Sequence, residues 1–311
     1  ESFGWHRDDA AIAANLDPVR TTQFDATPAG RIIMGGDEDV YLWRAVRKAT
    51  GKPAPAYPNV NQRDVGCCVG TGWKHGIDAL LAVQIAAGAR EEWTPVSAEA
   101  VYGFSRVEIG GGRISGDGSV GAWAAKGVKD YGVLAMMKYP NVDLTEFSPQ
   151  RARDFGRKGV PDDLEPTARE HPVQGTALVK SWNDVSKAIR QGYPVVVCSD
   201  QGFRMERDRN GRCATQGTWN HCMVILGVRG GNLEGAFILN SWGDSAHTGP
   251  VVPDDAPVAG FWADSLTVDR MVKQGDSFAI SDAKGFPARN LPLNWFIAVP
   301  RERDLFTLTR R

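Results

Sequence analysis

Hydrophobic residues follow helical spacing in the first half of the chain and strand-like spacing in the second. Helical periodicity predicts helices at residues 9–16, 37–50, 68–88, 97–106 and 119–131. After Pro172, short apolar runs bounded by Gly, Pro and Asn predict strands at 173–180, 194–199, 222–228 and 236–240, with one amphipathic helix at 182–191. Helices followed by strands indicate an α+β fold.

The same pattern predicts one two-lobe domain with an extension at each end. Residues 1–36 contain Asp, Pro, Gly and Thr with little periodicity. We expect them to add little to the core and to lie on the surface, or to reach a partner or propeptide site. The domain is expected over 37–300, with a helical lobe at about 62–172, a β-rich lobe at 173–300 and a tail at 301–311.

Composition excludes several classes of partner. The chain has 311 residues, 42% of them hydrophobic, with 36 basic and 37 acidic side chains. Nearly balanced charge offers no surface for nucleic acid. No apolar run approaches the roughly 18 residues of a membrane span, so membrane insertion is not expected. The first residue is Glu1 rather than Met, which favours a processed or extracytoplasmic product and leaves the compartment unknown.

The cysteines indicate neither a disulfide framework nor a metal site. The chain has five, an odd number, without a CxxC pair: Cys67, Cys68, Cys198, Cys213 and Cys222. No cofactor or metal is therefore expected. One thiol at least is free or pairs with another molecule.

One of these cysteines stands where a nucleophile would be activated. Cys68 follows Gln62 by six residues and lies between a glycine-flanked turn and a long apolar helix. The positive end of a helix dipole favours thiolate over thiol. The Gln62 amide and the Cys68 backbone N–H can converge on a developing oxyanion. The alternative is a buried structural thiol with an unrelated glutamine.

Five histidines compete for the role of base. His75 lies on the helix of Cys68 but about 10 Å further along its axis. His6, His171 and His247 lie in predicted loops. His221 begins a predicted strand, and the midpoint between it and Asn240 falls between Gly230 and Gly231. In a regular hairpin the two would face each other with Cβ atoms about 5 Å apart, and the Asn could orient the imidazole.

These residues resemble the papain-like cysteine peptidases in order and local context. The resemblance rests on Gln62, Cys68, the pair Asn220-His221 and the run from Asn240 through Ser241 and Trp242 to Gly243. It implies an α+β, papain-like two-lobe fold, with a helical lobe followed by an antiparallel β-rich lobe and the active-site cleft between them. It also implies a thiol endopeptidase acting on peptides or proteins without a cofactor.

The resemblance assigns a role to individual residues. Cys68 would be the nucleophile, His221 the base and later the acid, Asn240 the orienting residue and Gln62 the oxyanion donor. Six further residues would bind substrate: Asp117, Gly118, Cys198, Trp219, Asn220 and Cys222. From Cys198 and Trp219 we expect an apolar pocket wall without a fixed charge, although Cys198 and Cys222 can equally be core thiols.

Three departures from the family pattern mark a divergent member. Val65 stands where the family has a disulfide cysteine, Val69 where an aromatic residue is usual, and Cys67 where a small residue is usual. Two other functions therefore stay open. One is a catalytically silent papain-like domain with a binding or assembly role. The other is a transpeptidase or amide hydrolase that uses the same triad.

The spacing from Gln62 predicts that Cys68, and not Cys67, is the nucleophile. Cys68→Ala should abolish labelling by an epoxide-type thiol-protease probe and hydrolysis of peptides. Cys67→Ala should retain most of both, and peptide mapping identifies the labelled residue. The opposite result would transfer the role to Cys67.

Overall fold

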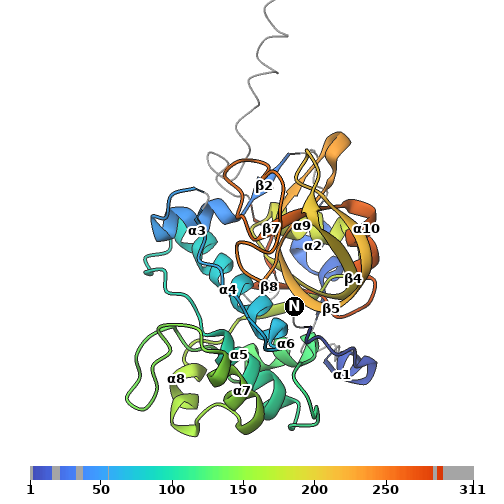
Figure 1. Ribbon diagram of the computed structural model, residues 1–311. Coiled ribbons are helices and arrows are strands. Elements are labelled where there is room, and N and C mark those ends of the chain that lie inside the picture. Colours follow the sequence, from blue (N-terminus) through green and yellow to red (C-terminus); the bar gives the residue numbers. More distant parts are fainter. Residues whose placement is uncertain (1–2, 16–21, 33–37, 55, 283–285, 290–311) are drawn as a thin grey trace, which may run out of the picture.

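The computed structural model describes residues 3–15, 22–32, 38–54, 56–282 and 286–289. The rest of the predicted extension and domain, and the whole predicted tail at 301–311, lie outside the described residues. Figure 1 shows α5, α6, α7 and α8 in the lower part of the molecule and the strands in the upper part together with α2, α9 and α10, with the long helix α4 between the two parts. The expected α+β organisation is confirmed.

The α-helices lie mainly before the long strands in the described chain. They are α1 (Asp9–Asn15), α2 (Pro28–Arg31), α3 (Trp43–Thr50), α4 (Cys68–Ala86), α5 (Ala98–Gly103), α6 (Gly121–Asp130), α7 (Pro149–Lys158), α8 (Glu165–Arg169), α9 (Trp182–Arg190) and α10 (Ser265–Val272). A π-helix at Phe104–Ile109 continues α5. Short 3₁₀ turns occur at Phe24–Ala26, Asp162–Leu164 and Gly231–Leu233.

The described strands form one sheet in the order β1-β3-β8-β4-β5-β6-β7, and β2 pairs with β5. Their bounds are β1 Thr22–Gln23, β2 Val40–Tyr41, β3 Gly175–Leu178, β4 Val195–Arg207, β5 Cys213–Arg229, β6 Gly235–Leu239, β7 Gly260–Asp264 and β8 Phe278–Ser281. The β1–β3 pair is parallel and the other strand pairs are antiparallel. Helices α3, α9 and α10 share a hydrophobic core with this sheet.

Helix α4 is buried along most of its length because glycines let it approach the sheet. A Cβ atom on Gly72 would lie 2.9 Å from the Cys222 Sγ, and one on Gly76 would lie 3.0 Å from the Ile280 side chain. On another side, a Cβ atom on Gly70 would lie 2.5 Å from the carbonyl oxygen of Ala98 in α5. These glycines are therefore required by close packing, which places the first turn of α4 against β5.

Part of the N-terminal extension belongs to the core, so the expectation that it adds little to the core is wrong. Phe24 and Ala29 are completely buried, and β1 pairs with β3. The Phe24 ring lies 5.8 Å from the ring of Phe286 in an edge-to-face arrangement. These elements are two to four residues long, so they leave no periodicity for a sequence pattern to reveal.

Some predicted elements differ in their bounds. The helix expected at 37–50 begins only at Trp43, because Val40 and Tyr41 pair with β5. The strand expected at 194–199 extends to Arg207, and its partner begins at Cys213 rather than residue 222. The polar parts of both strands carry no apolar alternation, and strand pairing alone defines them.

Phe24→Ala should destabilise the protein by about 3 kcal/mol, because it leaves a cavity beneath β1. Chemical denaturation followed by tryptophan fluorescence measures this loss. Leu266→Ala in α10 is the control, since Leu266 is 72% exposed and its loss should change stability by less than about 0.5 kcal/mol. Equal effects of the two substitutions would contradict a structural role for residues 22–31.

Candidate active site

Cys68 is the first residue of α4 and is completely buried. It packs in one hydrophobic cluster with Cys222, the neighbour of His221 in β5. Cys67 precedes the helix and packs in a different cluster, with Val65 and Tyr102. Within the described structure the two adjacent cysteines thus face different surroundings.

Burial raises the pKa of the Cys68 thiol well above its ordinary range, and the neighbouring Cys222 adds to this shift. Backbone groups of Cys222 and Gly4 act in the opposite direction. The thiolate expected from the helix dipole is therefore not the favoured form here. Loss of water around the sulfur outweighs the dipole of α4.

His221 is held by Asn240. The His221 Nε2 lies 3.0 Å from the Asn240 Oδ1, and both residues are completely buried. Since the amide oxygen can only accept, Nε2 carries the proton and Nδ1 carries the lone pair. Nδ1 is buried and has no hydrogen-bond partner among the described residues. The arrangement therefore presents Nδ1 as a proton acceptor.

The hairpin register predicted for His221 and Asn240 is wrong. Val224 lies opposite Leu239, and a bulge lies between Ile225 and Gly227. The turn also contains the 3₁₀ helix Gly231–Leu233, which the regular hairpin did not include. The two side chains meet because Asn240 follows the end of β6 and reaches His221 without being its directly opposed residue.

Ser241 connects this pair to Gln62. The Ser241 Oγ donates to the Gln62 Oε1 at 2.6 Å, and the Ser241 backbone N–H donates to the Asn240 Oδ1 at 2.7 Å. The Gln62 Nε2 donates to the carbonyl oxygen of Val65 at 2.9 Å. Because Oε1 is held by a hydroxyl, the donor end of the Gln62 amide is fixed on the Val65 side, toward the start of α4.

Trp242 covers the His221–Asn240 pair. Its ring stacks on the His221 ring with centroids 4.6 Å apart, and Trp219 packs on it in turn at 4.7 Å. Trp242 is 8% exposed. The indole thus keeps water from a hydrogen bond that would weaken if it were solvated.

A second histidine, His247, contacts the Asn240 side chain. The sequence pattern placed it in a loop and gave it no role. The Asn240 Nδ2 lies 3.2 Å from the His247 Nε2, and the His247 Nδ1 lies 3.7 Å from the Cys213 Sγ. Burial lowers the pKa of His247 to about 3, so the ring is neutral and Nε2 accepts from the amide. His247 therefore stabilises the amide orientation in which Oδ1 faces His221. No sequence signal separates it from other loop histidines.

The N-terminal segment crosses this site. The sequence pattern did not predict where this segment lies. The backbone N–H groups of Gly4 and Trp5 donate to the Asn220 carbonyl oxygen at 3.1 and 3.0 Å. The Phe3 ring lies 6.4 Å from the His221 ring and 5.7 Å from the Trp242 ring. A side chain on Gly4 would overlap the carbonyl oxygen of Gly66. Residues 3–6, here called the cleft segment, therefore cover Cys68 and His221.

Asp117 and Gly118 both contact the cleft segment. The His6 Nε2 donates to the Asp117 carbonyl oxygen at 3.0 Å, and a Cβ atom on Gly118 would overlap the His6 ring. The next residue, Ser119, exchanges backbone hydrogen bonds with Gly4 and His6, both at 2.8 Å. The loop at 117–119 thus binds an extended chain through its backbone in this structure.

The structure separates the four residues assigned to the pocket. Cys198 and Cys222 lie opposite each other on β4 and β5, in the cluster that also contains Trp5. Trp219 belongs to the other core and packs on Trp242. Asn220 has an exposed side chain and contributes its carbonyl oxygen.

The wall beside Cys198 contains a carboxylate, so the expectation of a wall without fixed charge is wrong. Asp276 is completely buried, and a Cβ atom on Gly121 would lie 2.8 Å from both its Oδ2 and the Cys198 Sγ. Its Oδ2 accepts from the Trp5 Nε1 at 2.7 Å and from the Gly121 N–H at 2.8 Å. Asp276 lies 78 residues beyond Cys198, and no local pattern links the two.

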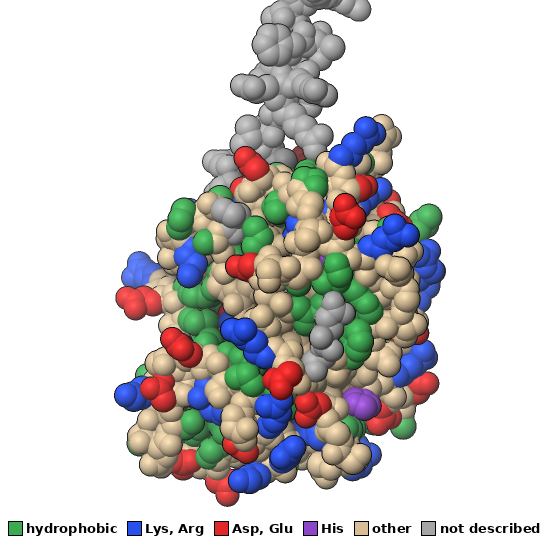
Figure 2. All heavy atoms as spheres, in the orientation of Figure 1, with side chains coloured by type: hydrophobic (Ala, Val, Ile, Leu, Met, Phe, Trp, Pro, Cys, Tyr) green, Lys and Arg blue, Asp and Glu red, His purple; other side chains and the backbone are tan. Residues whose placement is uncertain are grey.

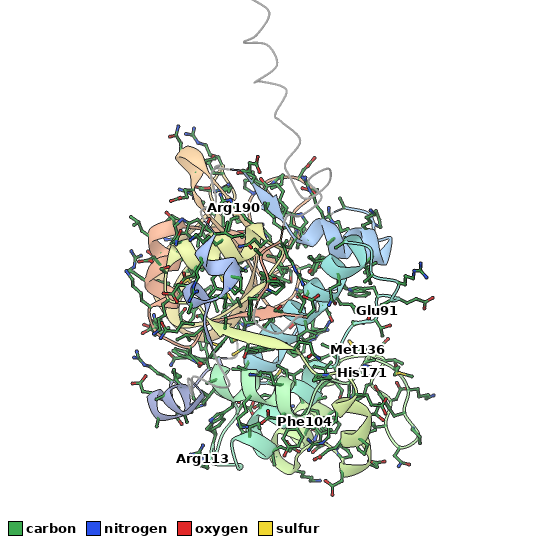
Figure 3. All side chains as sticks on the ribbon, turned by 180° about the vertical axis from the view of Figure 1, so that it is seen from behind. Glu91, Phe104, Arg113, Met136, His171 and Arg190 are labelled. Atoms are coloured by element: carbon green, nitrogen blue, oxygen red, sulfur yellow. The ribbon has the colours of Figure 1, made fainter. Side chains whose placement is uncertain are left out.

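The other face of the molecule carries a separate hollow of about 560 Å³, lined by the C-terminal half of α4 and residues such as Glu91 and His171. Figure 3 shows these two residues on the side opposite to that of Figure 1. Among the described residues, no cluster of three or more potential metal ligands occurs. None of the described helices combines the length and apolar character that a membrane span needs.

Comparison with solved structures identifies the architecture. The chain is similar to xylellain, a cysteine protease from Xylella fastidiosa, with a TM-score of 0.52 and 16% identity over 91% of this chain and 92% of that one. The chain has the papain-like fold. No family model and no curated protein sequence matches it.

Two further structures with the papain-like fold extend the comparison. A digestive procathepsin L 3 of Tenebrio molitor has a TM-score of 0.51 and 15% identity, over 90% of this chain and 83% of that one. A procathepsin B from Trypanosoma congolense has a TM-score of 0.53 and 11% identity, over 89% and 85%. At these identities the likeness concerns the fold alone.

Buried neutral histidines should make the protein less stable in acid. Burial lowers the pKa of His221 to about 4 and that of His247 to about 3, from 6.5. Between pH 6.5 and 4 the unfolded chain binds protons that the native histidines do not, so stability falls as the pH falls. Burial raises the pKa of Asp276 to about 6. Between about pH 6 and 3.8 the native carboxyl group therefore binds protons that the unfolded one does not, which opposes the loss of stability.

His247→Gln should therefore reduce the loss of stability between pH 6 and 4.5 by about 1.4 kcal/mol per pH unit. Urea denaturation at several pH values measures the slope for each protein. The slope is compared within each variant, so a constant loss of stability from the substitution does not affect it. An unchanged slope would show that His247 is charged in the native state.

Proposed function

We propose that the chain is a cysteine peptidase that hydrolyses peptide bonds through Cys68, His221 and Asn240, with peptides or proteins as substrates. The observation that carries the proposal is the state of His221. Its Nε2 is bonded to Asn240, and its buried Nδ1 has no partner in the described structure. A base with one nitrogen fixed and the other available is what a thiol nucleophile requires.

Formation of the nucleophile would begin when the cleft segment leaves. Removal of Phe3, Gly4 and Trp5 admits water to Cys68, which reverses the burial that raises its thiol pKa. His221 Nδ1 then takes the Sγ proton. The imidazolium that results keeps its Nε2–H on Asn240, while Ser241 and His247 hold that amide in place.

Attack of the Cys68 thiolate on a peptide carbonyl forms the C–S bond and a tetrahedral oxyanion. The Cys68 backbone N–H, at the positive end of α4, and the Gln62 Nε2 are the donors for this oxygen. His221 then protonates the departing amine, which leaves a thioester. Water, deprotonated by the same Nδ1, hydrolyses the thioester and restores the thiol.

The cleft segment would act as an inhibitory segment of this enzyme. Its backbone bonds to Asn220 and Ser119, residues of the two walls that flank Cys68. Two of the similar structures are described as procathepsins, which supports such a role for an N-terminal segment. Only the first part of the extension at 1–36 would serve it, because residues 22–31 are built into the sheet and its core.

Gly4→Val tests the proposal without truncating the chain. A valine would overlap the Gly66 carbonyl oxygen and expel the cleft segment. We expect probe labelling of Cys68 and hydrolysis of fluorogenic peptides to rise by at least about tenfold over the unsubstituted chain. Gly116→Val is the matched control, because a Cβ atom at Gly116 meets nothing within 4 Å.

The outcomes separate the alternatives. Labelling at Cys68 without hydrolysis in Gly4→Val would contradict a peptidase and favour a binding domain. Hydrolysis that is diverted into a new amide when an amine is added would favour a transpeptidase. Asn240→Ala in the Gly4→Val background should slow turnover by about tenfold or more while the far-ultraviolet circular dichroism is retained.

A further inference from the structure

Trp5 enters a pocket beside Cys68 whose floor is the carboxylate of Asp276. Trp5 is 4% exposed, and it packs among Val120, Cys198 and Cys222, in the cluster that contains Cys68. The indole N–H donates to the Asp276 Oδ2 at 2.7 Å. An apolar wall that ends in a carboxylate is a recognition site for a long side chain with a polar end.

Asp276 is buried and hydrogen-bonded. Burial raises its pKa, while hydrogen bonds from the Trp5 indole and from the backbone N–H groups of Gly121 and Ala122, in the first turn of α6, lower it. The net result is a pKa of about 6, so the group is charged at neutral pH. Asp8 and Cys198 are its titratable neighbours, and Asp8 adds to the rise.

Trp5 satisfies only half of this carboxylate. The Asp276 Oδ1 is buried and has no hydrogen-bond partner among the described residues. An indole has a single N–H, which Oδ2 already accepts. A guanidinium carries a fork of N–H groups that matches both oxygens of a carboxylate and adds the opposite charge. The pocket is therefore better suited to arginine than to the residue that fills it.

We propose that the Asp276 pocket recognises a basic side chain of the substrate, arginine before lysine, and that Trp5 is a weaker occupant which substrate displaces. This inference rests on the proposed peptidase function, because it names the substrate class of the same site. It replaces the apolar pocket wall without a fixed charge that the sequence analysis expected. It also accounts for Trp5 at this place in the covered form, because an uncharged donor binds the carboxylate less tightly than a guanidinium does and can be displaced.

Figure 2 shows acidic and basic side chains interspersed over the face that it draws, with hydrophobic side chains gathered near its centre. No extended acidic surface on this face would attract a basic substrate from a distance. Selection for arginine then depends on the buried carboxylate alone, and a single substitution should remove it.

The first experiment uses the full chain with Gly4→Val, which opens the cleft. Peptides that differ at one position, with Arg, Lys, citrulline, Trp or Leu, are compared at pH 8 at each position on the acyl side of the cleaved bond. At one position we expect kcat/KM for Arg to exceed that for citrulline, its neutral isostere, by at least about tenfold. Asp276→Asn should reduce this ratio to about twofold or less.

A preference for Leu or Trp over Arg at every position, or an Arg preference that survives Asp276→Asn, would overturn the proposal. The second experiment needs no turnover, so it separates failure of the pocket from failure of the peptidase function. It compares the rate at which iodoacetamide alkylates Cys68 in full chains with Trp5→Arg and Trp5→Phe, with peptide mapping to locate the label.

Trp5→Arg should close the cleft at least as well as Trp5 does, and Trp5→Phe, which lacks the N–H, should allow alkylation at least about tenfold faster. Asp276→Asn should bring the two rates within about threefold of each other. If arginine and phenylalanine at residue 5 give equal rates with Asp276 present, the pocket does not recognise a basic side chain, whether or not the protein is a peptidase.

Discussion

The close contact between α4 and β5 at Gly72 determines the rest of the site. A single Cβ atom there would lie 2.9 Å from the Cys222 Sγ, so a larger residue would push the helix away from the strand. The helix start carries Cys68 and the strand carries His221, so the separation of these two residues depends on this contact. The papain-like fold supplies the two elements, and glycine allows them to meet.

A chain of buried hydrogen bonds then orients the polar side chains. Ser241 binds both Gln62 and Asn240, and Asn240 lies between His221 and His247. Each amide in this chain has its oxygen and nitrogen distinguished by its partners, so neither can rotate without losing bonds in a buried place. Gln62 and His221 are therefore positioned by one network that crosses from the loop before α4 to the loop after β6.

Burial changes the chemistry of that network. Cys68 and His221 are completely buried, which raises the pKa of the thiol and lowers that of the imidazole. Both shifts favour the neutral pair. The structure therefore favours a thiol at Cys68 and a neutral imidazole at His221.

The sequence alone determined the α+β class and the helix that begins at Cys68, because periodicity is a local property, and its resemblance to the papain-like peptidases grouped Gln62, Cys68, His221 and Asn240. Tertiary structure decided what depends on contacts distant in sequence. A bulge between Ile225 and Gly227 changes the register of β5 against β6, and residues 22–23 pair with β3 as strand β1. His247 and Asp276 lie in loops without a motif, and only the fold brings them to the site. Whether a side chain is buried or solvated, and hence whether Cys68 is thiol or thiolate, depends on which segments pack over it, and this only the folded chain decides.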